Sequence, residues 1–385
     1  MARDKTVRII AGTVADARTD RGCAAVTVED GRIVELQHCS QDVRLGSGDV
    51  DMRGYALVPG FIDIHVHGGV GRSVMEGTED ALTVVGSHLL SHGVTSWLAT
   101  TVTGPLDTTR EVLNAARSMM RHGRDGANLL GVHLEGPYIN PVRKGAQPEQ
   151  YVLPPDPQGF LDWVGDLLPL VRIVTLAPEV IGGLELVRML CSLRIIPSIG
   201  HTDATYDEVC MAIDAGARHV THCCNAMRPL GSREPGVVGA AMTHPELTAE
   251  LIWDNIHVHP VVCNAIVQAK SPRGVILVSD GIPGAGMPEG YQFSLGDLPA
   301  VVKDGAARLP DGTLAGSLLT LNRAFANSAG WYLPASCTMT SYNAACALGL
   351  GDRKGLVAPG YDADLTALDA QGKVAAVWVA GQRRL

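Results

Sequence analysis

Apolar residues in the middle of the chain gather into eight short runs, and segments with a helical pattern separate most of them. The runs lie near residues 61–67, 94–99, 129–135, 171–176, 195–200, 218–222, 249–253 and 274–279. The clearest helical segment is Thr78 to His92, with Thr78 as its expected N-cap and Gly93 just past its end. Residues 107–122 and 204–215 have a similar pattern. Strands alternating with helices indicate a parallel sheet, and eight such units predict an α/β fold with a (β/α)8 TIM barrel.

The alternative architecture is a doubly wound open sheet, although no Gly-x-Gly-x-x-Gly turn follows the first run. Both ends of the chain look different from the middle, because short strand patterns follow one another there with turns such as Asp30-Gly31 between them. We expect these strands at 7–10, 24–28, 32–36, 56–58, 363–368 and 374–379. We therefore predict a small flanking β-sandwich domain from residues 1–58 and 355–385, and a barrel over residues 59–354.

Composition restricts the classes of function. The formal net charge of −9 argues against nucleic acid as the main partner, because phosphate backbones favour basic surfaces. Nine cysteines, an odd number without a Cys-x-x-Cys pair, suit reduced thiols better than a disulfide framework. The first residues lack an apolar signal core, and no apolar stretch approaches the length of a membrane span. The expected location is the cytoplasm, without a membrane partner.

Ionisable side chains stand at the ends of five of the eight runs. His65 and His67 close the first run, and on a strand they point to the same side. Taken alone, this pair could equally be two hydrogen-bonded core histidines. In a TIM barrel, however, functional residues come from the C-terminal ends of different strands. The other residues at such ends are Glu135, His201, His222 and Asp280.

Four imidazoles and two carboxylates on one rim predict a metal site. These ligands suit Zn²⁺ first, with Fe²⁺ or Mn²⁺ as alternatives. A divalent ion lowers the pKa of bound water to about 7 and so supplies hydroxide near neutral pH. A carboxylate beside that water, plausibly Asp280, can carry the proton to a leaving group. The pattern therefore indicates a metal-dependent hydrolase.

Several motifs then carry a family resemblance. Pro-Gly-Phe-Ile-Asp-Ile-His-Val-His-Gly at 59–68 resembles the opening metal motif of the amidohydrolase superfamily. Within it, the chain closely resembles the N-acetylglucosamine-6-phosphate deacetylase family from about residue 56 to Asp364. The motifs are His133-Leu134-Glu135-Gly136-Pro137, Gly200-His201, Thr221-His222, Asn225-Ala226-Met227 and Arg233-Glu234-Pro235-Gly236. A glutamate on the third strand, as at Glu135, distinguishes this family from relatives with a carboxylated lysine on the fourth.

The resemblance implies a deacetylase of amino-sugar catabolism that converts N-acetylglucosamine 6-phosphate to glucosamine 6-phosphate and acetate. It implies that Glu135, His201 and His222 bind the principal ion, that His65 and His67 allow a second, and that Asp280 is the general base and then acid. It also implies a homodimer, in which Arg233 and His257 hold the phosphate and can reach the site of the neighbouring subunit. The other substrate-binding residues that it implies are Ala146, Gln147, Asn225, Ala226, Leu314, Ala315 and Gly316.

The chain differs from the family at three places. Gln147 stands where the family usually has a histidine that polarises the acetyl carbonyl, and a second ion could take over that polarisation. Asn255 replaces a glycine near the expected phosphate, and Cys223-Cys224 replaces bulkier residues. Two other functions therefore stay open. One is deacetylation of another substrate, such as an N-acetylgalactosamine phosphate or an unphosphorylated acylamine, and the other is a non-catalytic relative that acts in binding or assembly.

Overall fold

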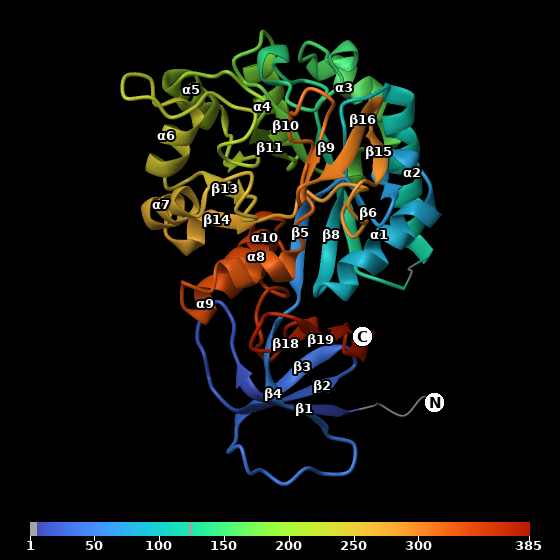
Figure 1. Cartoon of the computed structure of the whole chain (residues 1–385), viewed down its shortest axis with the longest axis vertical. Helices are drawn as coiled ribbons and strands as arrows, with labels where there is room; N and C mark the ends of the chain where they lie inside the picture. The colour runs from blue at the N-terminus through green and yellow to red at the C-terminus, as the bar shows by residue number, and fades with distance from the viewer. Residues whose placement is uncertain (1–5, 123–124) are drawn as a thin grey trace.

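The computed structural model describes residues 6–122 and 125–385. An eight-stranded parallel sheet forms the centre of the larger of its two parts (Figure 1). Each strand pairs with the next along the chain, from β5 through to β14. The two edge strands also meet, since the amide of Asp280 donates to the carbonyl of His65 over 2.9 Å. The predicted TIM-like barrel is confirmed. Its strands are β5 (Phe61–Val66), β8 (Val94–Thr101), β9 (Asn128–Glu135), β10 (Val171–Leu176), β11 (Ile196–Ile199), β12 (His219–Val220), β13 (Thr248–Leu251) and β14 (Val275–Leu277).

Helices follow most of these strands, and α1 begins at Thr78, the expected N-cap. The side chain of Thr78 accepts from the amide of Ala81 over 3.2 Å and so begins α1. Thr205 and Glu208 form a capping box at the start of α5, and Gly216 ends that helix in the left-handed region. The helices are α1 (Glu79–Ser91), α2 (Leu106–His122), α3 (Pro157–Val164), α4 (Gly183–Ser192), α5 (Tyr206–Ala215), α6 (Gly236–Thr243), α7 (Pro260–Lys270), α8 (Leu321–Asn327), α9 (Leu333–Cys337) and α10 (Asn343–Ala347).

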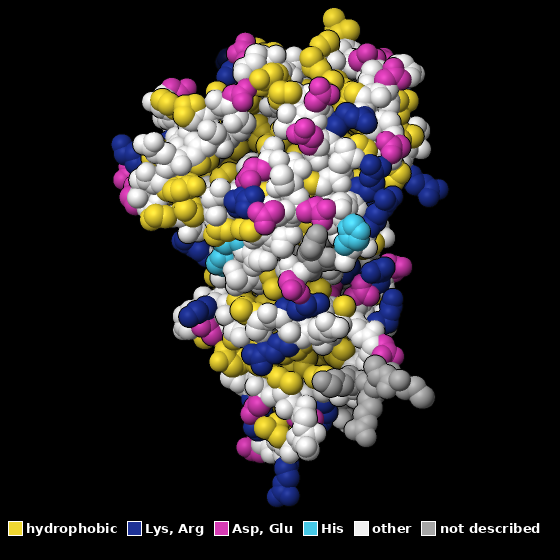
Figure 2. Space-filling model, turned by 90° about the vertical axis from the view of Figure 1, so that its right-hand side faces the viewer, with side chains coloured by type: hydrophobic (Ala, Val, Ile, Leu, Met, Phe, Trp, Pro, Cys, Tyr) yellow, Lys and Arg dark blue, Asp and Glu magenta, His cyan; other side chains and the backbone are white. Residues whose placement is uncertain are grey.

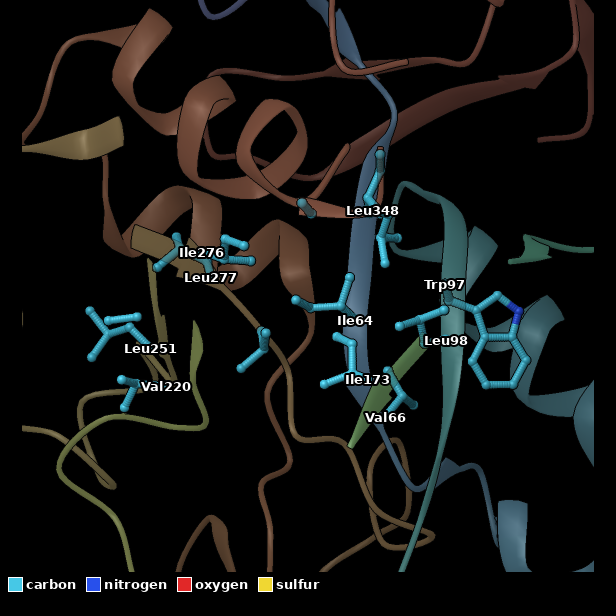
Figure 3. Close-up of a cluster of buried hydrophobic side chains, with 14 of the residues drawn as sticks. Ile64, Val66, Trp97, Leu98, Ile173, Val220, Leu251, Ile276, Leu277 and Leu348 are labelled. Atoms are coloured by element: carbon cyan, nitrogen blue, oxygen red, sulfur yellow. The ribbon is translucent and has the colours of Figure 1, made fainter. Parts of the chain in front are cut away.

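One large apolar cluster holds strands and helices together. Figure 3 shows part of it, with side chains from β5, β8, β10, β12, β13 and β14 gathered in one region. Trp97 and Ile64 in this cluster are fully buried. Burial of this kind contributes about 25 cal/mol for each Å² of apolar surface, so the barrel is a packed scaffold that fixes its strand ends.

Both ends of the chain join in one seven-stranded mixed sheet within the described residues (Figure 1). β4 lies inside this sheet between β1 and β18, and the register Leu365↔Pro59 joins the two ends. Val26, Ile33 and Trp378 share one buried cluster, so the sheet curls around its own core. The predicted pairing of the chain ends is confirmed, whereas the domain boundaries at 58/59 and 354/355 stay predictions. The strands are β1 (Val7–Val14), β2 (Ala24–Glu29), β3 (Arg32–His38), β4 (Val50–Pro59), β18 (Leu365–Leu368), β19 (Val374–Val379) and β20 (Gln382–Arg383).

A three-stranded antiparallel sheet, which the sequence analysis did not predict, lies between β14 and α8. Its strands are β15 (Gln292–Leu295), β16 (Leu298–Lys303) and β17 (Ala306–Arg308). Leu295 and Ala307 pack against Val102 and Ile282 at the top of the barrel. This insert therefore contributes a wall to the rim where the barrel strands end. A further short hairpin, β6 (Gly68–Gly69) with β7 (Arg72–Ser73), follows β5.

Charged side chains of both signs lie on the face of the molecule that Figure 2 shows. Basic and acidic side chains are interspersed there, and apolar side chains lie between them. Among the helices of the described residues, none is both long and apolar enough to cross a bilayer.

The joint between the barrel and the small sheet can be tested at Gly93, which has a φ of 84°. A Cβ there would lie 2.8 Å from the methyl group of Thr366 and 3.0 Å from the ring of Phe61. Gly360 has a similar φ of 88° but open space around its Cβ position. We expect Gly93→Ala to lower the unfolding free energy by roughly 1–3 kcal/mol more than Gly360→Ala, because only Gly93→Ala adds overpacking to backbone strain. Denaturant unfolding of both variants measures the difference, and equal losses would contradict the expected clash.

Candidate metal centre and active site

The six residues predicted for the metal site converge on one rim of the barrel. His65 and His67 lie at and just beyond the end of β5, and Glu135 is the last residue of β9. His201, His222 and Asp280 follow β11, β12 and β14 within three residues. All six residues are buried. Parallel strands bring these positions together although they are up to 215 residues apart in the sequence (280 − 65).

Three of these residues have an unusual backbone conformation. The φ angles of His201, His222 and Asp280 are 48°, 26° and 49°, in the left-handed region that side chains other than glycine disfavour. Such strain costs about 1–3 kcal/mol at each residue and is typical of functional sites. The chain thus turns sharply after each of these strands, and the turn directs the three side chains toward the cluster.

Glu135 is the centre of the cluster. Its Oε1 lies 3.1 Å from Nε2 of His201 and 3.0 Å from Nε2 of His222. The other imidazole pair lies farther out, with Nε2 of His65 3.4 Å from Oε1 and Nε2 of His67 3.4 Å from Oε2. The carboxylate therefore faces two pairs of imidazoles.

Asp280 lies on the side of the cluster that contains the first histidine pair, His65 and His67. Its Oδ1 lies 3.2 Å from Nε2 of His67 and 3.5 Å from Nε2 of His65. The two imidazole nitrogens are themselves 3.2 Å apart. His65, His67 and Asp280 thus form one possible ion site, and His65, Glu135 and His222 form another that overlaps it.

The donor set fits a divalent cation. Ligand atoms about 2.0–2.2 Å from a tetrahedral ion lie roughly 3.3–3.6 Å from one another, close to the spacings in this cluster. The Nε2 atoms of His201 and His222 face each other across 3.1 Å, an arrangement that is unfavourable for two bare lone pairs. A proton or a cation between them removes the repulsion. Nitrogen and oxygen donors together suit Zn²⁺, Fe²⁺ or Mn²⁺.

The charges of the cluster also favour a cation. Burial alone would raise the pKa of Glu135, but attraction to His201 and His65 holds it well below its ordinary value. Burial alone would lower the pKa of His67, yet hydrogen bonds with Asp280 and Glu135 raise it to about 9. The carboxylates thus stabilise positive charge at the imidazoles, whether it comes as protons or as a metal ion.

Gln147 is held in one orientation by two hydrogen bonds. Its side-chain oxygen accepts from the amide of Thr103 over 2.8 Å, and its amide nitrogen donates to Oε2 of Glu135. Gln147 is 4% exposed and lines the cavity. The side chain therefore presents a neutral N–H donor beside the cluster.

A cavity of about 250 Å³ opens above the cluster. This volume lies slightly below the range of about 300–1,000 Å³ that is common for ligand pockets, so the cavity suits one small ligand. The insert and the segment after it contribute part of the lining, and two loops of the barrel contribute another part. The lining residues are His67, Glu135, Gly145, Ala146, Gln147, His201, His222, Asn225, Ala226, Asp280, Leu295, Thr313, Leu314 and Gly316.

Four residues predicted for the site do not line this cavity. His65 lies behind its floor with no exposed surface, and Ala315 is buried in the apolar core under the insert. Arg233 is exposed on the loop between β12 and α6. His257 lies after β13, where its Nδ1 is 2.6 Å from Oδ2 of Asp254. The roles predicted for these residues stay predictions.

The neighbours of these residues also have definite places. The carboxylate of Glu234 accepts from the amides of Tyr206 and Gly236 and so fixes the loop that carries Arg233. Cys223 is buried in the core, and Cys224 lines a separate apolar groove beside α6 and α7.

Three more buried ionisable residues lie next to the cluster and were not predicted as site residues. They are Glu250, His219 and His133. Glu250 on β13 lies 2.9 Å from Nδ1 of His65 and 3.0 Å from Nε2 of His219. His133 bonds the carbonyl of Ile64 through Nδ1 and the hydroxyl of Thr175 through Nε2, as an ordinary core histidine does. The available signal for Glu250 was a single carboxylate inside the apolar run 249–253.

Comparison with known proteins gives three kinds of match. The model of the amidohydrolase family matches residues 56–384. An N-acetylglucosamine-6-phosphate deacetylase from Bacillus subtilis is 42% identical over 328 residues, which are 83% of this chain and 82% of the relative. An N-acetylgalactosamine-6-phosphate deacetylase from Escherichia coli O157:H7 is 36% identical, over 85% of this chain and 87% of the relative.

Among solved structures, a mutant N-acetyl-D-glucosamine-6-phosphate deacetylase from Mycobacterium smegmatis, in complex with N-acetyl-D-glucosamine-6-phosphate, superposes with a TM-score of 0.92. It is 31% identical in sequence, and the match covers 99% of this chain and 100% of that one.

Two buried histidines offer a test of the metal centre. His201 directs Nε2 into the cluster, whereas both ring nitrogens of His133 already have neutral partners. We expect His201→Ala to bind a divalent ion at least about 10-fold more weakly, because it loses a ligand, and His133→Gln to keep its ion. Metal analysis after dialysis against a weak chelator measures both. Equal ion content in the two variants would show that His201 is not a ligand.

Proposed function

Because the chain belongs to the amidohydrolase family, and within it to the N-acetylglucosamine-6-phosphate deacetylases, we propose that it releases acetate from N-acetylglucosamine 6-phosphate. The observation that carries this proposal is the convergence of four imidazoles and two carboxylates around one cavity. This donor set serves hydrolysis of an unactivated amide, which needs a polarised carbonyl, an activated water and a proton for the leaving amine. The products are glucosamine 6-phosphate and acetate.

Residues of the cluster divide these tasks. Glu135, His201 and His222 would hold a principal ion, and His65 and His67 a second one. When bound, a divalent ion supplies Lewis acidity at the carbonyl and lowers the pKa of water. Zn²⁺ is the ion that we propose first, with Fe²⁺ or Mn²⁺ as alternatives.

Asp280 and Gln147 supply the proton chemistry and part of the polarisation. Asp280 borders the cavity, and attraction to His65 outweighs the effect of burial and keeps its pKa below the ordinary value. It is therefore ionised at neutral pH and can accept the proton of the attacking water, then return a proton to the amine nitrogen. Gln147 would donate its N–H to the acetyl oxygen.

The rest of the sugar would lie in the cavity. Ala146, Asn225 and Ala226 would offer contacts to the sugar, and so would Leu314 and Gly316, with Ala315 packed behind them. The relative that acts on N-acetylgalactosamine 6-phosphate makes that epimer the second candidate substrate. An acetate-release assay with both sugars, each with and without 6-phosphate, separates the candidates. No release from any of them would overturn the proposed reaction.

We also propose a homodimer in the cytoplasm. An apolar groove beside α6 and α7 includes Leu230, Val261 and Val262, which are 56%, 68% and 40% exposed. Arg233 follows Leu230 on the same loop, so a second copy that covers this groove would bring its Arg233 close to the interface. The odd number of cysteines favours a reducing compartment.

Replacing Asp280 tests the proton transfer. We expect Asp280→Asn to lower the turnover number by about 10²–10⁴-fold, since an amide cannot accept the proton. The bound ion should remain, because the other imidazole and carboxylate ligands are intact. Acetate release and metal content are measured on the same preparation. Turnover near that of the unmodified protein would exclude Asp280 as the base.

Replacing Arg233 tests both the phosphate contact and the dimer. A guanidinium binds phosphate oxygens in a bidentate fork, so Arg233→Ala should lose most of the preference for phosphorylated over plain sugar.

If Arg233 completes the neighbouring site, mixed dimers of Arg233→Ala and Asp280→Asn chains regain one intact site. We expect refolded mixtures to recover activity above either variant alone. The absence of recovery in a dimer would place Arg233 in its own chain's site.

A further inference from the structure

We propose that Glu250 is a positioning residue that fixes the metal-binding geometry of His65 and of His222 at the same time. This inference deepens the proposed function and rests on it, because the ions have a catalytic task only if the chain is a hydrolase. None of the metal, base or substrate roles above uses Glu250. Its carboxylate is fully buried on β13, below the cavity floor.

The first contact determines which nitrogen of His65 is free. Oε2 of Glu250 lies 2.9 Å from Nδ1 of His65, so Nδ1 carries the proton and donates it to the carboxylate. Nε2 is then the nitrogen that remains to bind an ion, and it is the atom that faces Glu135 and Asp280. A carboxylate behind a histidine in this way orients the ring and makes it a better ligand.

The second contact reaches the other half of the cluster. The same Oε2 accepts from the backbone amide of His222 over 3.1 Å, and the backbone oxygen of Glu250 accepts from the amide of Cys223 over 2.8 Å. These bonds hold the chain where His222 has its left-handed φ of 26°. Glu250 therefore supports the conformation that turns His222 toward Glu135.

A purely structural carboxylate would not need this arrangement. His219 alone could neutralise Glu250, since its Nε2 lies 3.0 Å from Oε1. Asp63 provides the comparison, because it is equally buried but accepts from the backbone amides of His65 and Ser279 and not from the ring of His65. Glu250 instead directs its second oxygen to one ligand ring and one ligand backbone, which joins the two halves of the metal centre.

Ion binding measured without substrate tests this role. Bound Zn²⁺ per chain is determined by elemental analysis at graded, buffered concentrations of free Zn²⁺. Glu250→Gln keeps an oxygen that accepts from His65 and His222 but removes the charge, whereas Glu250→Ala removes both. We expect the free Zn²⁺ needed for half-loading to rise by about 10–100-fold in Glu250→Ala, with Glu250→Gln between it and the unmodified protein. The step of the binding curve that is absent from His65→Ala identifies the ion held by the first histidine pair.

A second carboxylate on the same rim is the matched control. Glu179 accepts from the side chains of Asn140 and Thr202 and from the amide of Asp203, without contact to a ligand ring. Glu179→Gln should leave the binding curve unchanged, and thermal unfolding of the ion-free variants shows whether each is folded. If Glu250→Ala does not fold, Glu250→Gln decides the question.

Two results would overturn the inference. One is an unchanged binding curve in the folded Glu250 variants, and the other is an equal weakening in Glu179→Gln. The proposed function fails separately, because a protein that loads its ions normally but releases no acetate contradicts the reaction and not the role of Glu250.

Discussion

The structure depends on the placement of one carboxylate, that of Glu135, at a buried point where four imidazoles meet. A charge out of contact with water is costly unless opposite charge and hydrogen bonds surround it. Glu135 is 2% exposed, and its two oxygens have imidazole neighbours from three other strands. The barrel satisfies this demand because parallel strands end at one rim, so residues that are distant in the sequence can compensate the same charge. The cavity, its polarity and its affinity for cations all follow from that arrangement.

The packed barrel stabilises the strained backbone of the site residues at its rim. His201, His222 and Asp280 have backbone conformations that are unfavourable on their own. The strands that lead to them are short and lie in a continuous apolar cluster, which holds them in register. Rigid packing below the rim thus stabilises local geometry that a flexible loop could not keep. The residues proposed as metal ligands consequently need little rearrangement to bind an ion.

Much of the fold was predictable from local pattern, since each barrel strand lies in a short apolar run and two expected helices, α1 and α5, have caps that act within a few residues. Thr78 and Gly216 are examples, because their cap bonds join neighbours in the sequence. The insert was not predictable in this way. Leu295 and Ala307 lie in strands of only four and three residues, and they become core residues only through contact with Val102 and Ile282.

The candidate site divides along the same line. The rim residues were found because they end apolar runs. Glu250 instead lies inside such a run, and its role depends on its contact with His65, which is 185 positions away in the sequence. The wall residue Leu295 was missed for the same reason as the insert that carries it. For Arg233 and His257 no local pattern distinguishes a contact within one chain from a contact between two.

The small sheet has a consequence for how the protein is made. β4 leads through the single residue Gly60 into β5, and its outer partner β18 begins only at Leu365. During synthesis the ribosome therefore releases the barrel segment while one side of β4 still lacks its neighbour. An open strand edge of this kind invites pairing with other chains until the last residues emerge. Pairing of the C-terminal strands thus completes the small sheet. A chain that ended before β18 would expose the unpaired edge of β4, next to the strand that carries the first histidine pair.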